Sequence, residues 1–66
     1  MSAAATARQP VLDRSDWELL VGLLERESRD LPLEIHRTAN RETQQRLRDR
    51  LQRAEALLVR VRPLVS

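Results

Sequence analysis

The second half of the chain carries a heptad pattern of hydrophobic and polar positions. Steps of three and four residues separate its members, which are Gln44, Leu47, Leu51, Ala54, Leu58, Val61 and Val65. This spacing places one apolar stripe along a long α-helix, and such a stripe needs another helix to cover it. The pattern predicts a helix over about residues 40–62, with Thr38 or Asn40 as its N-cap and Pro63 barring its continuation.

A shorter helix is predicted over about residues 15–30. Ser15 and Glu18 match the capping box, in which a side chain at each position accepts a backbone N–H of the other. One face of this helix then carries Trp17, Leu20, Val21, Leu24 and Leu31. Because the residue before a proline is disfavoured in helical geometry, Pro32 predicts that the helix ends near Asp30.

Residues 31–39, between the two helices, are predicted to form an extended strap. Leu31, Leu33 and Ile35 alternate with other residues, and this period of two is typical of an extended chain with one face turned inward. The predicted fold is therefore all-α, an antiparallel two-helix hairpin over residues 13–66. Residues 1–12 are mostly small and polar and are predicted to be a disordered tail.

The two predicted helices differ in length. At 1.5 Å per residue they are roughly 23 Å and roughly 33 Å long, so the second overhangs the first by about ten ångströms. Aliphatic residues on the overhang need a cover, which Val11 and Leu12 are too few to provide. We therefore expect a homodimer in the form of a four-helix bundle. Its expected interface consists of Leu19, Leu23, Leu57, Leu58, Val61 and Val65.

Two charged residues adjoin the apolar stripes and are candidates for setting the register of the helices. Glu27 falls on the apolar row of the first helix, and Arg50 flanks the stripe of the second at a position where coiled coils place register-setting charges. We expect Glu27 to lie level with Gln44, in a hydrogen bond or ion pair with Arg41 or Arg48 at the edge of the stripe.

Composition narrows the functional classes. The 66 residues include no cysteine, which excludes a disulfide scaffold and favours the cytoplasm, and no apolar run approaches the ~20 residues of a membrane span. No nucleophile has a base beside it, and Gly22 is the only glycine, so we expect no enzymatic activity. His36 and Glu34 share one side of the predicted strap, but two ligands are too few for a metal site. No cofactor is expected.

Charge is divided between the predicted helices. Residues 13–30 carry six acids and three arginines, a net charge of −3, while residues 40–66 carry seven arginines and three acids, a net charge of +4. The favoured interpretation is a solvated arginine face partly matched by the acids of the first helix. Nucleic-acid contacts through Arg46 and Arg53 are the weaker alternative, because neighbouring arginines point in different directions and acids interrupt them.

Around its second proline the chain resembles a known group of proteins. The run from Asp30 to Thr38, Asp-Leu-Pro-Leu-Glu-Ile-His-Arg-Thr, precedes a helix rich in leucine and arginine. This combination resembles small bacterial helical-hairpin proteins with a Leu-Pro-x-Glu-Ile-His strap, over about residues 15–60. The resemblance implies a hairpin and adds no activity. Thr43 departs from the group, which has a larger and often aromatic residue there.

Together these patterns favour a small self-associating helical interaction or scaffold module. Two alternatives stay open at this point. One is a regulatory or nucleic-acid-associated protein that uses the arginine-rich second helix. The other is an adaptor or antitoxin-like partner of a larger bacterial protein, for which the chain would bind an unidentified protein rather than a copy of itself.

Overall fold

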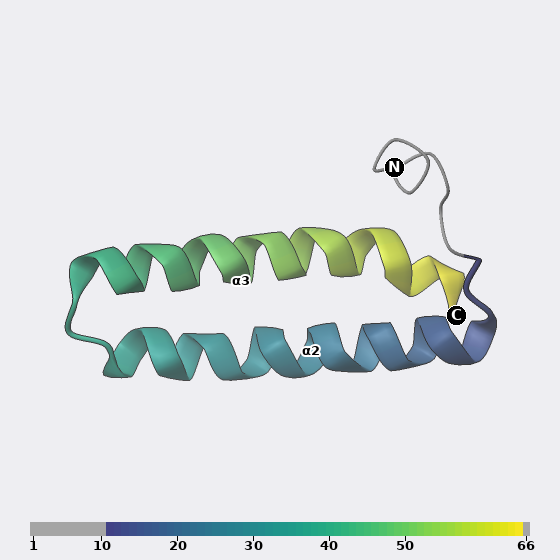
Figure 1. Cartoon of the computed structure of the whole chain (residues 1–66), viewed down its shortest axis with the longest axis horizontal. Coiled ribbons are helices and arrows are strands. Elements are labelled where there is room, and N and C mark those ends of the chain that lie inside the picture. Colours follow the sequence, from purple (N-terminus) through teal and green to yellow (C-terminus); the bar gives the residue numbers. More distant parts are fainter. Residues whose placement is uncertain (1–10, 66) are drawn as a thin grey trace, which may run out of the picture.

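The structure is a computed structural model that describes residues 11–65. Two long helices, α2 (Arg14–Arg37) and α3 (Arg41–Val61), run antiparallel and side by side, and the one-turn 3-10 helix η1 (Arg62–Leu64) follows (Figure 1). All regular structure in these residues is helical, so the predicted helical hairpin is confirmed. The predicted disordered tail lies outside the described residues, apart from Val11 and Leu12.

Helix α2 begins one residue earlier than the sequence predicted, and its capping box uses other residues. The Asp13 carboxylate accepts the Asp16 N–H at 2.8 Å, and the Asp16 carboxylate accepts the Asp13 N–H at 3.2 Å. Starting the helix here lets the Arg14 side chain donate to Glu18 at 3.2 Å and to the Val65 carbonyl at 2.7 Å. This start of α2 therefore allows a hydrogen bond between the two ends of the described chain, from Arg14 to Val65.

The predicted extended strap over residues 31–39 is wrong, because α2 continues through Pro32 to Arg37. Leu31 is 1% exposed and Leu33 is 57% exposed, whereas an extended strap would turn both inward. Proline lacks the N–H that would bond to the Ser28 carbonyl, and its place in a helix interior costs about 3 kcal/mol. Burying Leu31, together with the partial burial of Ile35, offsets this cost.

A short turn, residues 38–40, joins the helices and is closed by side-chain hydrogen bonds. The Asn40 side chain accepts the Thr43 N–H at 2.9 Å, which confirms Asn40 as the N-cap of α3. The Gln44 amide donates to the carbonyls of Ile35 at 3.1 Å and Thr38 at 2.7 Å. Gln44, the first member of the heptad pattern, thus binds one carbonyl in the last turn of α2 and the carbonyl of its C-cap residue, Thr38.

The helices have similar lengths, so the predicted overhang does not exist. With 24 and 21 residues, α2 and α3 are about 36 Å and about 32 Å long. The core between them contains Val21, Leu58 and Val61, with Trp17, Leu24 and Val65 packed against these three. Leu58, Val61 and Val65 were expected at an oligomer interface, but they belong to the hairpin's own core because the longer α2 reaches them.

Candidate protein–protein interface

One side of the hairpin is apolar in the half nearest the chain termini. We call this surface the apolar face, and its residues are Trp17, Leu20, Leu23, Leu24, Leu57, Val61 and Leu64. They line two adjoining shallow grooves that share Leu20 and Leu24. Leu20 and Leu57 are 38% and 40% exposed, and Leu23 and Leu64 are both 52% exposed. Both helices therefore present half-covered leucines on the same side of the molecule.

The apolar face arises from helical spacing. On α2, Leu20 and Leu23 lie one turn apart, beside the buried row that contains Val21 and Leu24. On α3 and η1, Leu57 and Leu64 are seven residues apart and therefore lie on nearly the same line along the helix axis. Because each helix buries only the stripe that faces its neighbour, the adjacent leucines stay half open to solvent.

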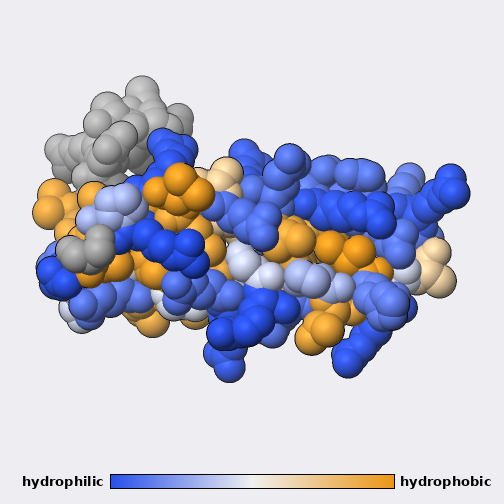
Figure 2. Space-filling model, turned by 180° about the vertical axis from the view of Figure 1, so that it is seen from behind, coloured by the Kyte–Doolittle hydropathy of each residue, from blue (hydrophilic) through white to orange (hydrophobic). Residues whose placement is uncertain are grey.

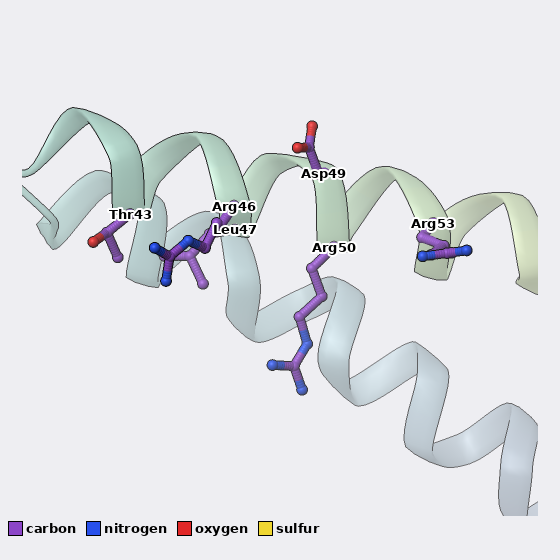
Figure 3. Close-up of a pocket in the computed structure, with 6 residues that line it drawn as sticks. All are labelled: Thr43, Arg46, Leu47, Asp49, Arg50 and Arg53. Carbon is purple, nitrogen blue, oxygen red and sulfur yellow. The ribbon is translucent and has the colours of Figure 1, made fainter.

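The half of this side nearest the turn is charged. A groove there is lined by Thr43, Arg46, Leu47, Asp49, Arg50 and Arg53, all from α3 (Figure 3). Arg50 extends toward α2, where its guanidinium forms an ion pair with the Glu27 carboxylate. Asp49 points away and accepts a hydrogen bond from Gln45 at 3.0 Å. The side chains of Arg46 and Arg53 make no hydrogen bond or ion pair within residues 11–65.

The ion pair between Glu27 and Arg50 confirms that Glu27 makes an ion pair at the edge of the apolar stripe. Its expected partners were different, because Glu27 was predicted to lie level with Gln44. Extending α2 to Arg37 moves the turn to residues 38–40, which slides α3 along α2 by about two turns. The Arg50 side chain is 66% exposed, so solvent screens the pair, which is worth roughly 0.2–1 kcal/mol. A role for the pair in setting register stays a prediction.

The opposite side of the hairpin makes its ion pairs internally. Arg62 contacts the Glu25 carboxylate at 3.3 Å across the two helices, and Arg14 contacts Glu18 at 3.2 Å along α2. In the view from behind, hydrophilic side chains cover most of both helices, while hydrophobic residues gather near the termini and in a narrow band between the helices (Figure 2). Val59, 71% exposed, lies on α3 away from both grooves of the apolar face.

The structure divides the six residues predicted for an oligomer interface into three groups. Leu58, Val61 and Val65 are core residues, although Val61 also lines the floor of one groove. Leu23 and Leu57 lie on the apolar face. Leu19 is 64% exposed but lines neither groove. The prediction missed Leu20, which was assigned only to the buried row. It did not list Leu64 at the interface, although Leu64 was among the aliphatic residues expected to need a cover.

Metal ligands do not converge in the described part of the chain. Within residues 11–65 no group of three or more histidine, cysteine, aspartate or glutamate side chains could hold a metal ion. Glu34 and His36 are both exposed on the last turn of α2. Among these residues neither helix combines the length and the hydrophobicity that crossing a membrane requires.

Comparison with known proteins identifies no relative from which a function could be inferred. No protein-family model matches the chain, and no curated protein and no solved structure matches it. The resemblance to bacterial helical-hairpin proteins stays a hypothesis.

Proposed function

We propose that this protein is a small helical interaction module that self-associates through its apolar face. The observation that supports the proposal is the position of four half-exposed leucines, Leu20, Leu23, Leu57 and Leu64, on one side of a folded hairpin. Two helices form a single layer, and stable domains usually pack two layers around a core. Covering the apolar face with a second layer removes these leucines from water.

The magnitude of this effect favours association. Complete burial of a leucine side chain is worth about 1.5–3 kcal/mol, so covering four side chains that are already half-buried contributes several kcal/mol. That is comparable with the total stability of a small domain. The groove between α2 and α3 nearest the termini is open and lined mainly by aliphatic side chains, which suits the packing of another helix better than the binding of a polar small molecule.

Variants on the apolar face test the proposal. Leu23→Glu and Leu57→Glu place a carboxylate in the proposed interface, and Val59→Glu adds the same charge to α3 outside the grooves. Sedimentation velocity over a hundredfold range of concentration measures association, and far-ultraviolet circular dichroism measures helix content. We expect wild type and Val59→Glu to associate and both leucine variants to stay monomeric with their helices intact.

If a glutamate variant loses its helix content, Leu23→Ala and Leu57→Ala provide the same comparison with less disruption. Each should weaken association about tenfold or more. A wild-type chain that is monomeric at every concentration contradicts the proposal, and so does equal weakening by Val59→Glu.

A nucleic-acid-associated function is the second candidate, because Arg46 and Arg53 have no ionic partner within residues 11–65. If these arginines bind phosphates, affinity for a short DNA or RNA duplex should fall steeply with salt. Arg46→Glu and Arg53→Glu should abolish binding. Arg48 does not line the groove that contains Arg46 and Arg53, so Arg48→Glu should weaken binding less. Binding that is absent in dilute salt excludes this candidate.

A further inference from the structure

We propose that two copies of the chain pack with their apolar faces together and their turns at the same end, α2 of each copy against α3 of the other. This inference rests on the proposed self-association and specifies its geometry. The charges that continue the apolar face toward the turn favour this arrangement, and so does the symmetry of a dimer.

Each helix presents one row of residues, at steps of three and four, on this side of the hairpin. The row on α2 is Asp16, Leu20, Leu23, Glu27, Asp30 and Glu34, and the row on α3 and η1 is Arg46, Arg50, Arg53, Leu57, Arg60 and Leu64. The three grooves on this side are lined by most of these residues, and helical spacing places Asp16 and Glu34 with them. Arg26 and Asp49 also line the grooves, but they lie outside the two rows.

The two rows have opposite charges and are largely unpaired within one hairpin. All four charged residues of the α2 row are acids, and all four of the α3 row are arginines. Arg50 is paired with Glu27, but the side chains of Arg46, Arg53 and Arg60 have no acidic partner within residues 11–65. The opposite side of the hairpin pairs Arg62 with Glu25 instead. The acidic row therefore fits a surface that carries arginines, and the arginine row fits a surface that carries acids.

A second copy offers such a surface in one of two symmetric arrangements. A two-fold axis parallel to the helices keeps both turns at one end and lays the α2 row of each copy on the α3 row of the other. A two-fold axis perpendicular to the helices places the turns at opposite ends and lays each row on itself. With the rows fully overlapped, the second arrangement sets Asp16 against Glu34 and Arg50 against Arg60. It also sets the remaining leucines of both rows against charged side chains, and both kinds of contact are unfavourable. Only the first matches opposite charges.

The first arrangement also matches leucines with leucines. Within one hairpin, Glu27 is level with Arg50, and Val21 packs against Leu58. One turn nearer the connection, Arg46 is therefore level with Asp30 and Glu34, and two turns nearer the termini Leu57 is level with Leu20 and Leu23. A parallel axis preserves these heights. Arg46 of one copy thus faces Asp30 and Glu34 of the second copy, and Leu57 faces its Leu20 and Leu23.

A charge exchange between copies tests this arrangement. Asp30→Arg and Arg46→Asp each create like charges across the interface, so each variant alone should dimerise at least tenfold more weakly than wild type. An equimolar mixture of the two variants restores both opposite pairs and should recover a heterodimer of near wild-type affinity. If Asp30 and Arg46 interacted only within one hairpin, mixing would restore nothing. Glu55→Arg, which changes an exposed acid of α3 that lines none of the three grooves, is the control.

A distance measurement provides an independent test, because the chain has no native cysteine. Ala39→Cys introduces one exposed thiol in the turn of each copy, to which a spin label can be attached. Turns at the same end bring the labels close together, whereas turns at opposite ends separate them by about the length of α3, ~32 Å. A dimer with the long distance and no recovery on mixing overturns this inference and leaves self-association intact. A monomer at all concentrations overturns the proposed function itself.

Discussion

At the scale of single residues, the start of α2 shows how two overlapping capping patterns compete. Ser15 and Glu18 fit the capping box by residue type, and so do Asp13 and Asp16, although aspartate is the less usual residue at the second position. The structure uses Asp13 and Asp16. This choice frees Glu18 to contact Arg14, whose guanidinium also donates to the Val65 carbonyl. The capping box that the structure uses is therefore the one that occurs together with a contact between distant residues, Arg14 and Val65.

A pair of alanine substitutions distinguishes the two caps. Asp13→Ala removes the acceptor for the Asp16 N–H and should lower the free energy of unfolding by about 1 kcal/mol. Ser15→Ala changes a residue in the first turn of the helix and should alter stability by less than about 0.5 kcal/mol. Urea denaturation followed by circular dichroism measures both. An equal or larger loss for Ser15→Ala would contradict the assignment of the cap.

At the scale of the elements, the continuation of α2 through Pro32 determines the shape of the hairpin. The sequence pattern around the proline suits an extended strap as well as a helix, because Leu31, Leu33 and Ile35 are spaced by two. The helix turns Leu31 into the interior and Leu33 into solvent. Burial against α3 is a tertiary effect, and it outweighs the local cost of the proline.

Replacing the proline should strengthen α2. Pro32→Ala restores a backbone N–H that can bond to the Ser28 carbonyl, and we expect stability to rise by about 1–3 kcal/mol. Pro32 is exposed, so the substitution removes little packing. Thermal and urea denaturation measure the change. A loss of stability would show that the proline stabilises the turn region in a way that the helical geometry does not explain.

The two leucines beside the proline provide a matched comparison. Leu31→Ala leaves a cavity in the interior and should cost about 2–5 kcal/mol, while Leu33→Ala removes a side chain that is 57% exposed and should cost less than about 1 kcal/mol. Urea denaturation at one protein concentration compares them. An extended strap with both leucines inward would give similar losses, which makes this pair a direct test of the helix.

At the scale of the whole molecule, the register between the helices decides which aliphatic residues are internal. Leu57 and Leu58 are neighbours in the sequence, yet Leu58 is 4% exposed and Leu57 is 40% exposed. Both were predicted at an oligomer interface on the assumption of a short first helix. With α2 at full length, Leu58 completes the hairpin core, and Leu57 joins the apolar face.

This division predicts different defects for adjacent substitutions. Leu58→Ala should lower the stability of the hairpin by about 2–5 kcal/mol. Leu57→Ala should leave hairpin stability within about 1 kcal/mol, when measured at concentrations where the chain is monomeric, and should weaken association instead. Urea denaturation and sedimentation velocity separate the two quantities. Equal losses of hairpin stability would contradict the separation of core from interface.

The sequence by itself determined the elements whose signals are local. Heptad spacing predicted α3, Asn40 predicted its N-cap, and Pro63 marked its end to within about two residues. The antiparallel hairpin followed from two apolar stripes and a short connection. An ion pair of Glu27 at the stripe edge could also be expected from its position, but its partner, Arg50, could not.

Only the tertiary structure decided the length of α2, the register and the division between core and open surface. These features depend on contacts between residues far apart in the chain, such as Val21 with Leu58 and Arg14 with Val65. The local sequence around Pro32 indicates the free-energy cost of a proline in a helix. It does not indicate the stabilisation that results when α3 covers the Leu31 side chain. Because that stabilisation comes from the other helix, the length of α2 and the register are determined together, by packing.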